Sequence, residues 1–157
     1  MSIFLLENRT GRLVRRCLAA LLLLLPTAAN AGHEMDNRDL RNGRKLYTEH
    51  CASCHGARLE GQPNWRQPGP DGVFPAPPHD ATGHTWHHDN QLLFDYTKLG
   101  GEALFAARGI RGPKSGMQGF ADVLTDDGIW DILAYIRSTW PERVKEVQAA
   151  RNPPHNR

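Results

Sequence analysis

Apolar and polar positions alternate with a helical period in the stretch that follows residue 36. Between Asn37 and Cys54, apolar and small residues return every three or four positions, and most of the positions between them are polar. Asp36 or Asn37 can act as the N-cap of this segment. Gly43 lies inside the predicted helix, where glycine costs about 1 kcal/mol relative to alanine, so we expect another backbone to approach closely there.

Helical periodicity returns in the second half of the chain. Asp89 can cap a helix of about three turns that ends before Gly100 and Gly101, and residues 102–111 are expected to add a turn. After Thr125, whose hydroxyl can cap a helix start, a longer helix is predicted. Pro141 either ends this helix or begins another one. The buried stripe of the longer helix is predicted to comprise Ile129, Ile132, Leu133 and Ile136.

The stretch between these helical segments, residues 55–85, is rich in proline and glycine and keeps no helical period. A structureless connection of this length is unusual in a compact domain unless it wraps around something. The carbonyl groups of its Pro75-Ala76-Pro77-Pro78 run are free to accept a hydrogen bond from an imidazole N–H. The pattern as a whole predicts an all-α fold of three to five helices joined by long loops.

The first 31 residues have the composition of a cleaved secretory signal peptide. Four arginines precede an apolar run over residues 17–25, and Ala29-Asn30-Ala31 forms a small-x-small cleavage site. The apolar run is shorter than the roughly 20 residues of a membrane-spanning helix, so no transmembrane segment is expected in the mature chain. We therefore predict a periplasmic or otherwise exported protein, cleaved near Ala31, with a domain over residues 32–141 and a polar tail over residues 142–157.

Charge separates the predicted signal from the mature chain. Without residues 1–31 the chain has 15 basic and 16 acidic residues, whereas the full sequence has a formal net charge of +2. The basic balance of the full sequence therefore belongs to the signal peptide, and nucleic-acid binding is not expected.

The strongest chemical pattern is Cys51-Ala52-Ser53-Cys54-His55, which matches the C-x-x-C-H pattern of covalent haem attachment. The two thiols, three positions apart, can bond to the two vinyl groups of one porphyrin, while the adjacent imidazole ligates its iron. A redox CxxC pair would need a βαβ context, and a zinc site would need two further ligands. A disulfide is the third alternative. The mature chain has no other cysteine, so we expect one covalent haem to help hold the fold together.

A six-coordinate haem needs a second axial ligand, which is usually a methionine sulfur or a second imidazole. Met35 precedes the first predicted helix and is expected to be mobile. Met117 lies in the glycine-bracketed loop of residues 112–120, which can fold over the ring with Phe120 beside it. By elimination, we predict that Met117 is this ligand.

Four histidines of the middle loop compete with this assignment and support a second hypothesis. They could bind copper or zinc, or they could be ordinary polar residues of which one or two meet the haem propionates; they are His79, His84, His87 and His88. Trp86 could also hydrogen-bond a propionate. If Met117 is not a ligand, the open iron position would suit a haem sensor or a haem enzyme.

These residues resemble class I cytochromes c, small soluble monohaem electron carriers, over most of the mature chain. The family places a glycine eight residues and an aromatic residue four residues before the first haem cysteine, as Gly43 and Tyr47 stand here. Its C-terminal helix often reads like residues 131–137. The resemblance implies a cytochrome c-like fold wrapped around one haem, with the first and last helices crossing at Gly43.

The resemblance also implies roles for the loops. A loop proline carbonyl of the family accepts the N–H of the proximal histidine, and Pro77 and Pro78 are the candidates here. The axial methionine is commonly followed by proline, one residue and phenylalanine, whereas this chain has Gln118 directly after Met117. A thioether and an imidazole together leave iron no open position, so we expect a one-electron carrier with transient redox partners rather than an enzyme.

Overall fold

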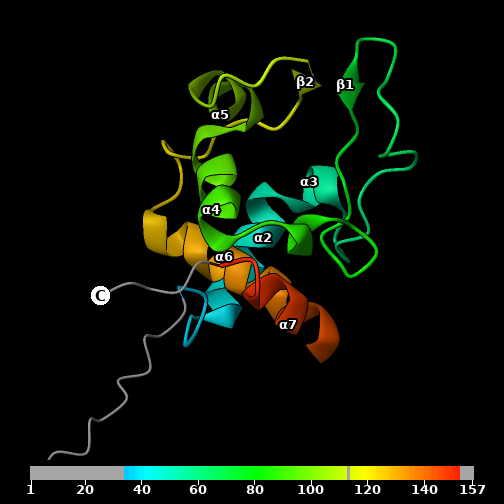
Figure 1. Cartoon of the computed structure of the whole chain (residues 1–157). Helices are drawn as coiled ribbons and strands as arrows, with labels where there is room; N and C mark the ends of the chain where they lie inside the picture. Colours follow the sequence, from blue (N-terminus) through cyan, green and yellow to red (C-terminus); the bar gives the residue numbers. More distant parts are fainter. Residues whose placement is uncertain (1–33, 113, 153–157) are drawn as a thin grey trace, which may run out of the picture. The chain divides into compact units, whose positions relative to one another are not determined.

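The computed structural model describes residues 34–112 and 114–152, so the predicted signal peptide and its cleavage site lie outside the described residues. The described part is predominantly helical (Figure 1), which confirms the predicted all-α fold. Its helices are α2 (Leu40–His50), α3 (Ala52–His55), the 3₁₀ helix η2 (Thr85–His87), α4 (Asn90–Leu99), α5 (Gly101–Ala107), α6 (Asp126–Ser138) and α7 (Glu142–Ala149). Two short strands complete it, β1 (Val73–Phe74) and β2 (Lys114–Ser115).

Helix α2 starts later than predicted, because Asp39 is its N-cap. The Asp39 carboxylate accepts hydrogen bonds from the amides of Arg41 and Asn42, each at 3.0 Å. Asn37 instead adopts a left-handed backbone conformation with a φ of 57°, whereas an N-cap needs an extended backbone. The predicted caps, Asp36 and Asn37, are therefore wrong by two or three residues.

Helices α2 and α6 cross at Gly43, as predicted. A Cβ atom on Gly43 would overlap the backbone oxygen of Asp131, so only glycine allows the two helices to approach this closely. Beside the crossing, the Asn42 side chain donates a hydrogen bond of 2.8 Å to the Asp131 carboxylate. Figure 1 shows α2 directly behind α6. The crossing therefore joins the segment that leads into the C-x-x-C-H motif to the main buried helix.

The core lies along α6. The predicted stripe of Ile129, Ile132, Leu133 and Ile136 is buried, with each side chain at most 5% exposed, which confirms the expected face of this helix. The Thr125 hydroxyl accepts a hydrogen bond of 3.1 Å from the amide of residue 128 and caps the helix as predicted. Burying such side chains contributes roughly 1.5–3 kcal/mol each, so α6 organises the hydrophobic cluster.

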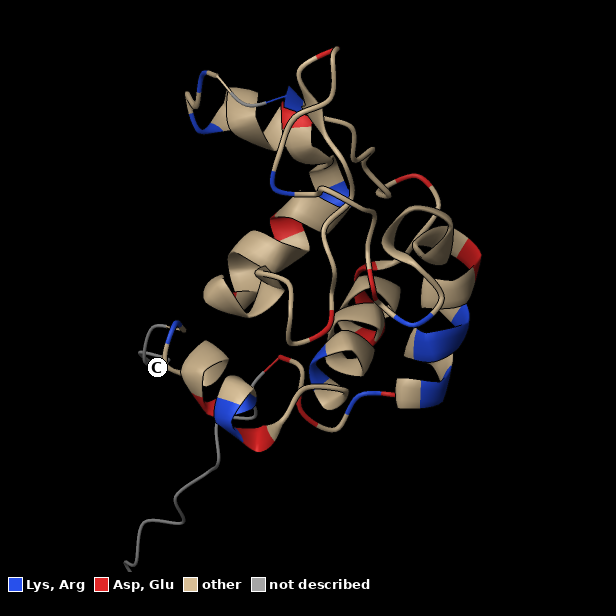
Figure 2. Cartoon of the chain, turned by 90° about the vertical axis from the view of Figure 1, so that its right-hand side faces the viewer, with Lys and Arg blue, Asp and Glu red and all other residues tan. Residues whose placement is uncertain are grey.

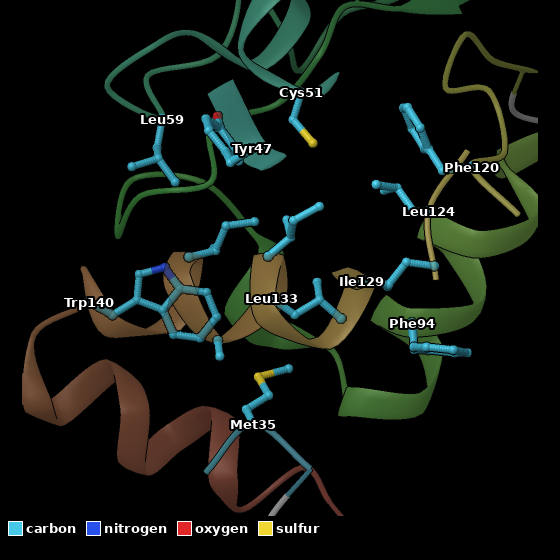
Figure 3. Packing of buried hydrophobic residues seen from close by; sticks show 13 residues of the cluster. Met35, Tyr47, Cys51, Leu59, Phe94, Phe120, Leu124, Ile129, Leu133 and Trp140 are labelled. Atoms are coloured by element: carbon cyan, nitrogen blue, oxygen red, sulfur yellow. The ribbon is translucent and has the colours of Figure 1, made fainter. Parts of the chain in front are cut away.

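The expectation that Met35 is mobile is wrong. Its side chain is only 4% exposed and belongs to the core cluster, together with Trp140. Figure 3 shows Met35 on one side of α6 and Cys51, Tyr47 and Phe120 on the other. The segment before α2 is held in place because Arg38 donates hydrogen bonds to the Glu34 carbonyl at 2.7 Å and to Asp127 at 2.8 Å.

The predicted long loop between α3 and α4 contains no α-helix. Within it, β1 pairs in parallel with β2, with Val73 opposite Lys114 and Phe74 opposite Ser115. This ladder was not predicted, because each strand has only two residues and shows no alternation long enough to read. It joins the middle loop to the segment just before Met117.

The predicted polar tail contains a helix, which is one of the two alternatives predicted for Pro141. Residues 142–149 form α7, so Pro141 precedes a new helix. The Gln148 side chain is fully buried and donates hydrogen bonds to the Asn90 side chain at 2.7 Å and to the His88 carbonyl at 3.3 Å. Polar side chains thus attach α7 to the start of α4, which a hydrophobic pattern does not reveal.

The polar face of α2 is exposed and basic. Arg41, Arg44 and Lys45 lie on this face, and the structure describes no ion pair for any of them. Figure 2 shows the Lys and Arg positions of this helix in blue, at the edge of the drawn chain. Among the described residues, none of the helices combines the length and apolar character needed to span a bilayer.

We predict that Gly43→Ala lowers the free energy of unfolding by about 2 kcal/mol or more, because the new methyl group forces α2 and α6 apart. Chemical denaturation of the holoprotein measures this change. Gly128→Ala is the matched control, because a Cβ there would meet only the side chains of Leu46 and Thr125, at 3.2 and 3.3 Å. A Gly43 variant no less stable than the control would contradict the crossing.

Candidate functional site

The C-x-x-C-H motif lies at the break between α2 and α3. Cys51 ends α2, and its carbonyl accepts hydrogen bonds from the amides of Cys54 at 3.1 Å and His55 at 2.9 Å. This single turn places Cys51 in the core, at 7% exposed, and leaves Cys54 exposed. Both cysteines are free, so the disulfide alternative receives no support.

The environment of Cys51 does not suit a redox cysteine. Burial, followed by the neighbouring Cys54, raises the pKa of the Cys51 thiol to about 12. A thiol–disulfide exchange site instead needs a thiolate at neutral pH, and such sites lower the pKa of their reactive cysteine. Cys51 is therefore a buried, protonated thiol, and the neighbouring Cys54 thiol is exposed.

His55 is oriented by the middle loop. Its side chain is buried, and its Nδ1 atom lies 2.8 Å from the carbonyl oxygen of Pro77. Burial lowers the pKa of His55, and the hydrogen bond to Pro77 opposes that shift. A neutral imidazole that donates Nδ1–H to a carbonyl keeps its Nε2 lone pair free, which is how metal-ligating histidines are usually held. The His55 side chain is therefore oriented as an iron ligand would be.

Of the two candidate prolines, only Pro77 contacts the His55 ring through its carbonyl. The Pro78 carbonyl faces Gly83 instead, where a Cβ atom would overlap it. The amide of His79 donates a hydrogen bond of 2.8 Å to the Leu59 carbonyl. The loop therefore folds back on itself around Pro77 and Pro78, which holds the acceptor carbonyl next to the Nδ1 atom of His55.

His79 packs directly against His55. The two rings are stacked, with 3.9 Å between centroids and 26° between planes. Removal of the ring from water, followed by the proximity of His55, lowers the pKa of His79 well below its ordinary value. The Trp140 indole donates a hydrogen bond of 2.7 Å to the His79 carbonyl. His79 and His55 therefore lie side by side in the same buried region.

The Met117 loop is attached to the junction between α4 and α5. The amide of Gly101 donates a hydrogen bond of 3.0 Å to the Met117 carbonyl, and Phe120 donates its amide to the carbonyls of Thr97 and Lys98, both at 3.1 Å. Met117 is partly buried and packs against the core cluster, and Phe120 is 6% exposed. Met117 is therefore held at the edge of the core, in a loop fixed on both sides of it.

The remaining candidates of the middle loop are engaged elsewhere. The single N–H of the Trp86 indole donates to the Ala81 carbonyl at 3.3 Å, which leaves it no donor for a propionate. The Trp86 ring stacks on His87 at 3.7 Å, and the rings of His84 and His88 meet edge to face at 5.4 Å. Among the described residues, no group of three or more His, Cys, Asp or Glu side chains is placed to hold a metal ion.

Two supporting contacts of the motif were not predicted. The Tyr47 hydroxyl donates a hydrogen bond of 2.9 Å to the carbonyl of Gly56, the residue after His55. Burial, followed by nearby groups, raises the pKa of Tyr47 and keeps the phenol protonated. The other contact is the His79 stack. The sequence draws attention to Tyr47, because it is an aromatic residue four positions before Cys51. It does not reveal the partner of the Tyr47 hydroxyl, which depends on how the chain turns after His55.

Comparison with known proteins identifies one family. A family model described as cytochrome c matches residues 40–140, which is well over half of the chain. The match begins at the first residue of α2 and ends at Trp140, after α6, so it spans the C-x-x-C-H motif, the middle loop and the Met117 loop. No curated protein and no solved structure matches the chain.

We predict that Tyr47→Phe lowers the free energy of unfolding by about 1 kcal/mol, because the partly buried Gly56 carbonyl keeps only the Leu59 amide as its donor. Urea denaturation of the holoprotein measures the change. Tyr135→Phe is the control on the same helix crossing, because the structure describes no hydrogen bond for its hydroxyl. Equal stabilities of the two variants would show that the Tyr47 hydroxyl does not support the motif.

Proposed function

Because the chain belongs to the cytochrome c family, it is an electron carrier with covalently attached haem c, and we propose that it works outside the cytoplasm with His55 and Met117 as axial ligands. Cys51 and Cys54 would hold the haem. The observation that supports the proposal most directly is the hydrogen bond of 2.8 Å between His55 and the Pro77 carbonyl, because it places the proton on Nδ1 and leaves the Nε2 lone pair free, while burial keeps the ring neutral.

Haem c supplies an iron that takes up and releases one electron. The chain's own residues determine how that iron is held. His55 is fixed by the turn from Cys51 and by Pro77, and Met117 is fixed by backbone hydrogen bonds to α4 and α5. Bound by both side chains, the iron would have no position left for a substrate, and a methionine paired with a histidine would raise its reduction potential. This arrangement suits electron transfer rather than catalysis.

A second iron ligand would have to come from a part of the chain other than the surroundings of His55, which favours Met117 over the other candidates. Met35 lies across α6 from Cys51 (Figure 3) and is buried in the core. His79 stacks on His55 itself, so it lies on the same side as the first ligand. Met117, in contrast, lies in a loop that is attached to α4 and α5 and not to the turn that holds His55 by any of the described backbone hydrogen bonds.

Cytochromes c exchange electrons with redox partners, and we infer that the contacts of this chain are short-lived and steered by charge. The exposed basic face of α2 leads directly into the C-x-x-C-H motif. Complementary charge raises association rates more than it raises affinity, which suits a carrier that must release each partner. An acidic surface on a partner would meet this face.

We predict that Met117→Ala opens the iron: the ferrous holoprotein binds carbon monoxide and the reduction potential falls, because the thioether is lost. Absorption spectroscopy and redox titration measure both effects. Met35→Leu is the matched control and should keep the native spectrum, because leucine fills a similar volume in the core. Wild-type ferric and ferrous spectra in the Met117 variant would refute the assignment, and carbon monoxide binding to the wild-type ferrous protein would then favour an open-site haem protein.

We also predict that the exported holoprotein begins after Ala31, because residues 1–31 have the features of a cleaved signal peptide. Mass spectrometry of periplasmic protein identifies the first residue of the mature chain. Replacing the five leucines of residues 21–25 with polar residues should prevent export and haem attachment together. Haem-loaded protein with an intact N-terminus in the cytoplasm would contradict the proposed location.

A further inference from the structure

We propose that Ser115 is a positioning residue that fixes the backbone of Met117. This inference rests on the proposed role of Met117 as an axial ligand. In this chain Gln118 follows Met117, so no proline restrains the backbone there, as a proline would by fixing its own φ angle. Side-chain and backbone hydrogen bonds around Ser115 supply a restraint instead.

The Ser115 hydroxyl connects α4 to the backbone amide of Met117. Its oxygen accepts a hydrogen bond of 2.7 Å from the hydroxyl of Tyr96, which lies in α4. The same oxygen accepts a hydrogen bond of 3.2 Å from the amide of Met117. One oxygen atom therefore links a helix of the core to the residue that is proposed to bind iron.

The backbone around Ser115 is attached to the start of α5. The Ser115 amide donates a hydrogen bond of 2.6 Å to the Glu102 carboxylate, and the Met117 carbonyl accepts one of 3.0 Å from the Gly101 amide. A Cβ atom at position 101 would overlap the Ser115 hydroxyl. Glycine at position 101 therefore lets the Ser115 side chain lie against the helix start.

The β1–β2 ladder holds Ser115 from a third direction. Phe74 pairs with Ser115, and the Lys114 side chain donates a hydrogen bond of 3.3 Å to the Asp71 carbonyl. Both partners belong to the middle loop, which also carries the Pro77 carbonyl that orients His55. Ser115 therefore lies where the loop that supports one proposed ligand meets the loop that carries the other.

If Ser115 fixes Met117, removing its hydroxyl should let the thioether leave the iron more often while the helices remain folded. Ser115→Ala removes the shared acceptor, and Tyr96→Phe removes one donor to it. Ser138→Ala is the matched control, because that exposed hydroxyl bonds only the Tyr135 carbonyl at the end of α6. The test compares these three variants with Met117→Ala and with the wild-type holoprotein.

Imidazole binding to the ferric holoprotein reports how readily Met117 leaves, because imidazole must replace it. We expect affinity to rise about fivefold in Ser115→Ala, the factor that one typical hydrogen bond provides, and to rise in Tyr96→Phe as well. The long-wavelength absorption band of methionine on ferric iron should disappear, on heating, before the helical circular dichroism does. Ser138→Ala should match the wild type in both measurements.

The inference is overturned if Ser115→Ala and Tyr96→Phe bind imidazole no more tightly than Ser138→Ala, or if their absorption band and helices melt together. Failure of both variants to acquire haem would also overturn it, because a positioning role leaves the attachment residues intact. A Met117→Ala spectrum identical to wild type would refute the axial assignment and the inference together. A changed Met117→Ala spectrum with unchanged Ser115 and Tyr96 variants would leave the assignment standing and remove only the role of Ser115.

Discussion

The hydrogen bond between the His55 ring and the Pro77 carbonyl is the interaction on which the site depends. It selects the tautomer of His55 that carries its proton on Nδ1 and fixes the plane of the ring, so the Nε2 atom is available to a metal. It also explains the middle loop, because a proline-rich segment offers carbonyl acceptors whose own residues have no amide donor. The α2–α6 crossing at Gly43 holds the helix that leads into the motif, and Tyr47 secures the turn that follows it.

The two segments that are proposed to carry the iron ligands are held by backbone hydrogen bonds as well as by packing. The turn of the C-x-x-C-H motif is closed by hydrogen bonds to the Cys51 carbonyl, and the backbone of the Met117 loop forms hydrogen bonds with the end of α4 and the start of α5. An electron carrier benefits from this design, because ligands that stay in place through a change of oxidation state leave little to reorganise. The family match supplies the cofactor and the activity, and the contacts of the described residues explain how this chain would position them.

Much of the fold follows from local patterns. The Thr125 cap, the Asp89 cap and the stripe on α6 were predictable because each depends on residues close in sequence. The crossing at Gly43 was predictable only through the family resemblance, since a glycine alone does not name its partner. The C-x-x-C-H motif could be read directly because its chemistry needs contiguous residues.

The contacts that were missed join residues far apart in sequence. Met35 is buried because it packs beyond α6, and Gln148 is buried because its amide group finds Asn90, so neither follows a hydrophobic period. The Trp86 donor is occupied by a nearby carbonyl, which composition cannot show. The choice of Pro77 over Pro78 depends on how the loop folds back, and that in turn depends on tertiary contacts.

The central claim, that one haem is bonded to Cys51 and Cys54, is tested most directly by the intact mass of protein recovered from the periplasm of a host that matures c-type cytochromes. The account predicts the mature polypeptide plus the mass of a single haem that denaturation does not remove, with neither cysteine open to alkylation. A colourless protein of the bare polypeptide mass, with both thiols alkylated after unfolding, would contradict it.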